Sequence, residues 1–219
     1  MYATGRWEKL KIPAERARFN TTGRLLVKHG PPGQVLEIGC GEALLQRQLE
    51  PAAYLGWVGI DISEVAIHRA QEFTTDRVRY HVADMERFDP GTRFDCIIFT
   101  ESIYYSADSR RLLARYVRFL KPGGRIIVSI FRTKRSQRIW TGLHAVAAPI
   151  DRLATSNELG SWDCEVLVPR ESPATGRIPP AGSRNDGHLV AAQGPHGLSS
   201  SWLDFWIPEG FEDKQGFHL

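Results

Sequence analysis

Short apolar runs alternate with longer amphipathic stretches through the first 170 residues of the chain. The runs are nearly continuous in apolar residues, as in strands covered on both faces, and the stretches carry apolar residues at helical spacing. This pattern predicts strands at 35–38, 56–61, 78–82, 94–99 and 125–131, and helices at 42–49, 63–73, 108–120 and 136–147. Strands that alternate with helices in this way predict a Rossmann-like, doubly wound α/β fold with a mostly parallel sheet.

The alternation gives way to a different pattern after residue 147. Two extended segments, 150–156 and 162–168, are separated by Asn157-Glu-Leu-Gly, and Asn and Gly around a short gap predict a hairpin. The hairpin completes a seven-stranded sheet and makes its last strand antiparallel. We therefore expect one domain over residues 1–170. The segment that begins residues 171–219 is rich in Gly, Pro and Ser, which predicts a flexible tail.

Two glycines lie between the first strand and the stretch that follows, in the sequence Glu37-Ile-Gly39-Cys40-Gly41. Glycine permits a tight turn and a close approach of the backbone to a ligand, and a helix after the loop would offer free N–H groups. Asp61 ends the second strand, 22 residues after Gly39, where a carboxylate can accept both ribose hydroxyls of a nucleoside. Facing an empty pocket, this carboxylate is expected to have few partners in the free protein. The alternative is a simple turn followed by a helix-capping Asp61.

Four side chains bear on the kind of nucleoside. A dinucleotide fingerprint requires a third glycine at the position of Leu44, so a dinucleotide becomes the second choice. Glu37 favours a ligand with an amino group, because a carboxylate attracts an ammonium and repels a phosphate. After the third strand, Asp84 can accept a hydrogen bond from an exocyclic amine, and Met85 can lie against a purine ring.

Residues 35–131 resemble, block by block, the class I S-adenosylmethionine-dependent methyltransferases. Glu37-Ile-Gly-Cys-Gly is similar to the glycine motif of that family, Gly59-Ile-Asp-Ile-Ser to its ribose motif and Ala83-Asp-Met to its adenine motif. The fourth strand, the Lys-Pro-Gly-Gly turn before the fifth and the antiparallel last strand also match. The chain departs from the family at Ala43, where many members carry a third glycine. The resemblance implies S-adenosyl-L-methionine as the cofactor, bound by Glu37, Gly39, Cys40, Gly41, Asp61, Ile62, Asp84, Met85 and Glu101.

A shorter resemblance concerns the acceptor of the methyl group. Thr100-Glu-Ser-Ile-Tyr-Tyr is similar to small-molecule methyltransferases of the nodulation N-methyltransferase type, which act on an amino group of an oligosaccharide. It implies methyl transfer to a nitrogen or oxygen of a small molecule or saccharide. Glu101 is the first candidate for contact near the methyl group, Tyr104 and Tyr105 for the walls of the substrate pocket, and His144 for a general base. A structural acid, packing tyrosines and a surface or core histidine are the alternatives. In the resembled fold a segment such as residues 1–30 often covers the cofactor, which predicts a helical lid.

Two further function classes stay open, a nicotinamide-dependent oxidoreductase and a catalytically inactive cofactor-binding protein that serves a partner. A net charge of +3 and the lack of an Asn/Asp-Pro-Pro-Tyr/Phe motif after the fourth strand argue against a nucleic-acid substrate. No apolar run is long enough to predict a membrane helix, and the first ten residues predict no secretory signal. Three cysteines without a CxxC motif, and histidines without metal spacing, predict a cytoplasmic protein without a metal. The pattern predicts no oligomeric state.

Overall fold

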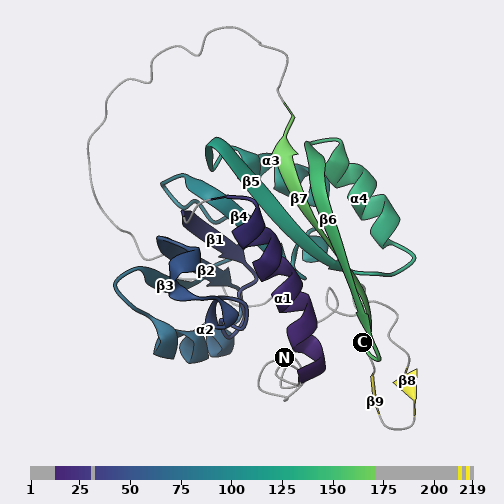
Figure 1. The fold of residues 1–219 in the computed structure, drawn as a ribbon, viewed down its shortest axis with the longest axis horizontal. Coiled ribbons are helices and arrows are strands. Elements are labelled where there is room, and N and C mark those ends of the chain that lie inside the picture. The colour runs from purple at the N-terminus through teal and green to yellow at the C-terminus, as the bar shows by residue number, and fades with distance from the viewer. Residues whose placement is uncertain (1–12, 31–32, 171–211, 214–215, 218–219) are drawn as a thin grey trace, which may run out of the picture.

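The computed structural model describes residues 13–30, 33–170, 212–213 and 216–217 (Figure 1). The first 12 residues of the predicted lid, and the predicted tail apart from four residues, lie outside the described residues. None of the described helices is long and apolar enough to cross a membrane.

Seven strands form one sheet in the order β3-β2-β1-β4-β5-β7-β6. The first five strands in the chain run parallel to one another, and β7 is antiparallel to both β5 and β6. The predicted seven-stranded, mostly parallel sheet with an antiparallel end is therefore confirmed. The strands are β1 (Gln34–Ile38), β2 (Gly56–Asp61), β3 (Val78–Val82), β4 (Phe94–Thr100), β5 (Leu120–Phe131), β6 (Ala147–Asn157) and β7 (Gly160–Pro169), with a separate pair β8 (Glu212–Asp213) and β9 (Gly216–Phe217).

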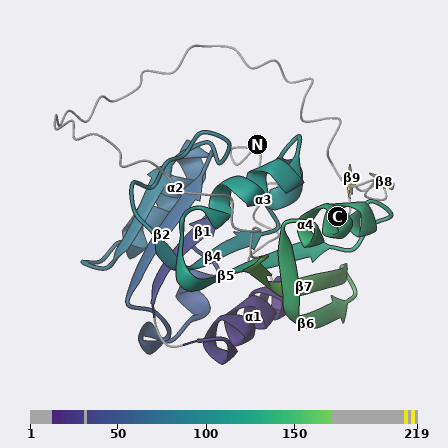
Figure 2. The ribbon, with the colours of Figure 1, turned by 90° about the horizontal axis from the view of Figure 1, so that it is seen from above.

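Helices cover both faces of the sheet, α1 on one side and α3 and α4 on the other (Figure 2). Their bounds are α1 Pro13–Lys28, α2 Glu64–Ala70, α3 Ser109–Val117 and α4 Ser136–His144. Ser63 caps α2, because its hydroxyl accepts a hydrogen bond from the Ala66 N–H at 3.3 Å. Asp108 caps α3 in the same way, since its carboxylate accepts from the Arg111 N–H at 3.0 Å. A polar side chain at each N-cap satisfies a backbone donor that the helix itself leaves unpaired.

Two apolar cores hold the layers together. One contains buried residues of α1 and α2 against one face of the sheet, among them Leu25 and Ile67. The other packs Leu112 of α3 and Leu143 of α4 against the opposite face. Because the central strands are buried on both faces, their sequences are continuously apolar, as the sequence pattern required.

The helix predicted for residues 42–49 does not form. This segment consists of turns and a short 3₁₀ helix at Gln46–Gln48, and further 3₁₀ turns lie at Pro51–Ala53, Gln71–Phe73 and Ile103–Tyr105. The cause is Ala43, whose φ of +63° lies in the left-handed region and breaks a right-handed helix at its start. Leu45 is nonetheless fully buried in the core. The apolar spacing of this segment therefore predicted its burial correctly, but its secondary structure wrongly.

The described part of the predicted lid is a helix that packs on the sheet. The buried face of α1 contributes Phe19, Leu25 and Leu26 to the core. Its Thr21 hydroxyl is hydrogen-bonded to Thr155 of β6, and Lys28 pairs with Asp151 of the same strand at 2.8 Å. Residues 13–28 thus form a fixed layer of the domain.

Candidate cofactor and acceptor site

The predicted site residues other than His144 lie toward the carboxyl edge of the sheet, where β1 and β4 lie side by side. The chain leaves β1 toward β2 and leaves β4 toward β5, so the connections diverge at this point. In open α/β sheets a crevice for ligands forms at such a divergence. Gly39 and Glu101 follow β1 and β4 directly, and Asp61 ends β2, so all three residues lie at this edge.

The glycine loop turns across the end of β2. The N–H groups of Gly39 and Cys40 both donate to the carbonyl of Ile60, at 2.8 and 3.0 Å. Gly39 has a φ of +76°, and a Cβ there would lie 2.5 Å from the Cβ of Ser102. Any side chain at this position would meet both backbone strain and a steric clash. The glycine is therefore required by the fold of the loop and brings bare backbone to this edge of the sheet.

Asp61 has more partners in the free protein than the sequence led us to expect. Its Oδ2 accepts from the Gly41 N–H at 3.0 Å, and its Oδ1 accepts from the Ser63 N–H at 2.9 Å. The carboxylate therefore joins the glycine loop to the start of α2, and the expectation of few partners was wrong. Burial raises its pKa against these backbone hydrogen bonds. Each oxygen keeps a second lone pair, so ribose hydroxyls can still be accepted.

Glu37 is a buried acid with one oxygen left without a hydrogen bond. The side chain is 1% exposed, and its Oε1 accepts from the Thr100 hydroxyl at 3.3 Å. Its Oε2 makes no hydrogen bond of normal geometry with the described residues, although the Trp57 side chain lies close enough to lower the pKa of Glu37 against burial. Burial raises the pKa of Glu37 to about 8, although the Thr100 hydrogen bond acts in the opposite direction. An unpaired buried carboxyl oxygen is costly, and an ammonium group placed beside it would relieve that cost.

Arg18 is a site residue that sequence reasoning missed. It lies on α1, is 4% exposed, and its charge lowers the pKa values of Glu37 and Glu101 against the larger effect of burial. The guanidinium also lies 4.2 Å from the ring centre of Phe19. The only signal in the sequence was an arginine on what proves to be the buried face of an amphipathic helix.

Glu101 is held in a strained conformation by three hydrogen bonds. Its φ is +53°, in the left-handed region that a side chain with a Cβ disfavours. Oε1 accepts from the Ser129 hydroxyl at 2.5 Å, and Oε2 accepts from the Phe131 N–H at 2.7 Å and the Tyr104 hydroxyl at 3.1 Å. Burial raises the pKa of Glu101. Strain fixed by surrounding contacts is common at functional sites.

The other expected residues lie at the ends of β2, β3 and β4. Ile62 is 70% exposed, and Asp84 accepts a hydrogen bond from the Glu86 N–H at 2.9 Å within its own turn. Met85 packs against the core that α3 and α4 share. After β4, the rings of Tyr104 and Tyr105 are 4.9 Å apart, and Tyr105 is 44% exposed.

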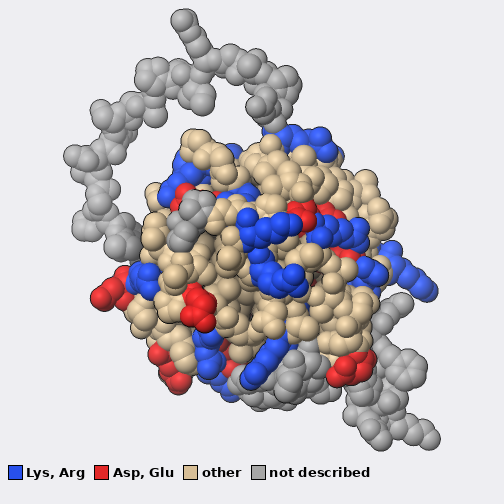
Figure 3. All heavy atoms as spheres, viewed as in Figure 1, with Lys and Arg blue, Asp and Glu red and all other residues tan. Residues whose placement is uncertain are grey.

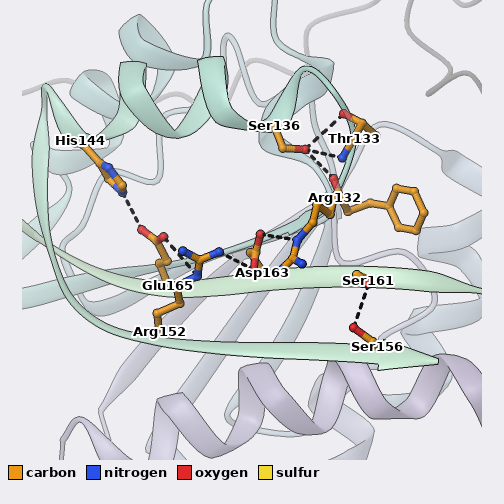
Figure 4. Close-up of polar contacts among 10 residues, drawn as sticks. Arg132, Thr133, Ser136, His144, Arg152, Ser156, Ser161, Asp163 and Glu165 are labelled. Carbon is orange, nitrogen blue, oxygen red and sulfur yellow. Dashed lines mark hydrogen bonds and ion pairs between the residues drawn. The ribbon is translucent and has the colours of Figure 1, made fainter.

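His144 is not brought to this edge. It is the last residue of α4, a helix that starts beside the carboxyl end of β5 and runs back along the sheet. Its Nε2 lies 2.6 Å from Oε2 of Glu165, a residue buried on β7 (Figure 4). Glu165 pairs with Val128, whereas the strand end at Phe131 pairs with Trp162. The imidazole is thus engaged by an acid three residues along β7 from the site edge.

No group of three or more His, Cys, Asp or Glu side chains suited to a metal occurs in the part of the chain that the structure describes. Cys40, Cys96 and Cys164 are all buried and none forms a disulfide.

Comparison with known proteins gives a consistent picture. Residues 36–128 match the family described as "Methyltransferase domain". Nodulation protein S of Rhizobium tropici is 28% identical over 184 residues, which cover 77% of this chain and 76% of that protein. The 27-O-demethylrifamycin SV methyltransferase of Amycolatopsis mediterranei is 30% identical over 135 residues, 58% of this chain and 50% of its own length. Among solved structures, the N-methyltransferase NodS of Bradyrhizobium japonicum in complex with S-adenosyl-L-homocysteine aligns with a TM-score of 0.67 at 24% identity, covering 75% of this chain and 92% of that one.

Proposed function

We propose that this chain is a class I S-adenosylmethionine-dependent methyltransferase, which transfers a methyl group from S-adenosyl-L-methionine to a nitrogen or oxygen of a small molecule or saccharide. The observation that carries the proposal is the buried Glu37 oxygen without a partner, beside a glycine loop that Asp61 ties to α2. This arrangement suits a ligand with an ammonium group at one end and a ribose at the other.

The residues of the crevice fit this cofactor. Glu37 would accept the ammonium group, and Arg18 would face the carboxylate of the same amino-acid moiety. Asp61 would accept the ribose hydroxyls while keeping its two backbone donors. The exposed Ile62, together with Asp84 and Met85, would border the adenine at the ends of β2 and β3. Gly39, Cys40 and Gly41 supply the backbone surface between these two groups.

The bound cofactor supplies a methyl group already activated on a sulfonium, so the protein mainly has to align the acceptor. Holding reacting atoms in line can supply about 7–11 kcal/mol of the barrier in favourable cases. Glu101 is fixed by donors from β5 and from Tyr104, so it offers a rigid contact beside the acceptor. A neutral amine needs no strong base, and a hydroxyl acceptor would gain about 10²–10⁴-fold from one. His144 has no part in this proposal, because Glu165 holds it away from the edge.

Two observations support a small acceptor. The paired rings of Tyr104 and Tyr105 form an aromatic wall next to Glu101, on which a sugar or a planar acceptor can lie. The similarity to nodulation protein S extends over most of both chains, beyond the cofactor-binding half. A saccharide acceptor and a location in the reducing cytosol, which the three buried unpaired cysteines favour, are parts of this proposal.

Ligand-dependent melting tests the proposal. S-adenosyl-L-homocysteine should raise the Tm, because a ligand that binds only the folded state stabilises it, and NAD should not. Glu37→Gln should reduce the shift, whereas Asp76→Asn, an exposed change after α2, should not. A shift with NAD alone would support the oxidoreductase. A shift with S-adenosyl-L-homocysteine, but no methylated product from amine, phenol and amino-sugar acceptors, would support the inactive binding protein.

A further inference from the structure

A shallow hollow lies beside Glu101, at the connection between β5 and α4. Tyr104, Phe131, Thr133, Arg135 and Ile139 are among the residues that line it. Two of these residues also contact Glu101: the Tyr104 hydroxyl and the Phe131 N–H both donate to its Oε2. The hollow therefore adjoins the place where the acceptor atom has to lie if the proposed function is correct.

The connection is strongly basic, and the two buried acids of β7 near it are already paired. Four cations, Arg132, Lys134, Arg135 and Arg138, follow one another within seven residues. Arg132 forms a two-pronged pair with Asp163, at 2.6 and 3.1 Å, and Arg152 takes the same carboxylate at 2.7 Å (Figure 4). Glu165, the second buried acid on this face of β7, is held by His144 at 2.6 Å and by Arg152 at 3.9 Å.

The remaining three cations form no ion pair within the part of the chain that the structure describes. Lys134, Arg135 and Arg138 are exposed, and none of them forms an ion pair or a side-chain hydrogen bond with any of the described residues. Lys and Arg side chains project at the edge of the molecule where the β5–α4 connection lies (Figure 3). Of these three cations, Arg135 is the one that also lines the hollow.

The positions of these charges are unfavourable without an anion. Arg135 is the N-cap of α4, and the first turn of that helix contains no acidic residue. The N-terminal end of a helix carries a partial positive charge, so cations are disfavoured there and anions are favoured. The fold thus keeps unpaired positive charge at the positive end of α4, next to the acceptor position. Binding a negative group would offset both contributions.

We propose that the hollow is an acceptor subsite for an anionic oxyacid group, a phosphate monoester or a carboxylate, with Arg135 as its main donor. The guanidinium presents a planar set of N–H groups that matches either oxyanion, and Thr133 is another polar residue that lines the hollow. Lys134 and Arg138 add attraction at the mouth. This inference rests on the proposed function, because the hollow can hold part of the acceptor only if the acceptor lies beside Glu101. It adds that the acceptor carries a negative group.

The test measures anion binding directly on the full chain saturated with S-adenosyl-L-homocysteine. Backbone amide resonances of residues 133–137 are followed by NMR during titrations with inorganic phosphate, with acetate and with methylammonium as a cationic control. We expect saturable shifts with phosphate or acetate and none with methylammonium. The two anion arms distinguish a phosphorylated acceptor from a carboxylated one. Arg135→Gln should lower the affinity for the anion at least tenfold, as expected for losing a charge-assisted hydrogen bond.

Arg118→Gln is the matched control, since Arg118 is an exposed arginine at the C-terminal end of α3 and loses the same charge. It should leave anion affinity within twofold. Equal anion affinity in Arg135→Gln and the parent protein, or shifts that do not saturate, would overturn the subsite. Calorimetry with S-adenosyl-L-homocysteine on the same samples keeps the two proposals apart. Its failure to bind would count against the methyltransferase, whereas normal binding without anion saturation would count against the subsite alone.

Discussion

The two halves of the sheet treat charge in opposite ways. The half formed by β1, β2 and β3 brings acids to the carboxyl edge, and burial raises the pKa values of Glu37 and Asp61. The half formed by β5, β6 and β7 buries Asp163 beneath arginines, whose hydrogen bonds lower its pKa against the effect of burial. Beyond these pairs, it leaves Lys134, Arg135 and Arg138 at the same edge. The first half therefore presents buried carboxyl groups that a cationic ligand would neutralise. The second half presents basic side chains that an anionic ligand would neutralise.

The two halves also differ in the part of the chain that would contact a ligand, which is the backbone in the first half and side chains in the second. In the first half the proposed ligand surface is a glycine loop whose shape depends on φ values that few residues adopt. In the second half the proposed surface consists of side chains at the connection between β5 and α4, among them Phe131 and Arg135. A family can keep the first surface for one cofactor while the second changes with the acceptor. Glu101 lies between them, directly after β4 and hydrogen-bonded to β5.

The largest effect is expected where the halves meet. Glu101→Ala should lower kcat by about 100-fold, because a misplaced acceptor can cost that much, and should change the affinity for S-adenosyl-L-homocysteine by less than about threefold. It should also lower the free energy of unfolding by about 1–3 kcal/mol, since the Phe131 N–H loses its acceptor. Tyr104→Phe, which removes one donor only, is the matched control. A kcat that is unchanged in Glu101→Ala would place this residue in the scaffold alone.

The next effect concerns the cofactor half. Asp61→Ala should lower the affinity for S-adenosyl-L-homocysteine by about 10–100-fold, as expected for the loss of charge-assisted hydrogen bonds worth about 1.5–3 kcal/mol. Because Gly41 and Ser63 also lose their acceptor, the apo protein should be destabilised by about 1–3 kcal/mol in urea melts. Asp61→Asn keeps an oxygen for one donor and should recover part of the stability. Unchanged affinity in calorimetry, together with a lower melt midpoint, would assign Asp61 a purely structural role.

The hydrogen bonds of Asp61 illustrate how much of the site could be predicted from the sequence. Apolar runs and their spacing predicted the strands, the sheet and the positions of the loops, because burial on two faces leaves a clear pattern. They did not predict the hydrogen bonds that Asp61 makes within the free protein, which depend on how two loops meet. They also missed the left-handed Ala43 that prevents the helix at 42–49, and Arg18, whose role depends on how α1 packs. His144 was weighed as a base from residue type, before its partner on β7 could be known.

Glu37 should make cofactor binding depend on pH. With a pKa of about 8 in the free protein, most Glu37 is protonated at pH 6. Glu37 has to lose this proton when it pairs with the ammonium group of the ligand. The affinity for S-adenosyl-L-homocysteine should therefore rise about tenfold from pH 6 to pH 7 and level off above pH 8, while the ligand amine stays protonated. Calorimetry over this range measures it. Glu37→Gln should bind more weakly at pH 8, without the slope.

The same acid should make the free protein less stable as the pH rises. Its folded pKa lies above the unfolded value of 4.5, so the unfolded chain ionises first, and the free energy of unfolding should fall between about pH 4.5 and pH 8. Glu37→Gln removes this contribution, so its apo Tm should fall less over that range than that of the parent protein. Identical pH profiles of the two proteins would mean that Glu37 is ionised in the free fold, and its unpaired oxygen would then need another explanation.

The smallest effect on activity is expected at His144. Its imidazole contacts the buried Glu165 away from the carboxyl edge, so His144→Ala should leave kcat within about twofold under saturating acceptor. Glu165 is 3% exposed and would lose one of its partners, which should lower the free energy of unfolding by about 1–3 kcal/mol. Arg152→Gln removes another partner of the same carboxylate and should act on stability in the same way. A large loss of kcat in His144→Ala with no such loss in Arg152→Gln would restore His144 as a general base, and would mean that α4 serves the reaction as well as the fold.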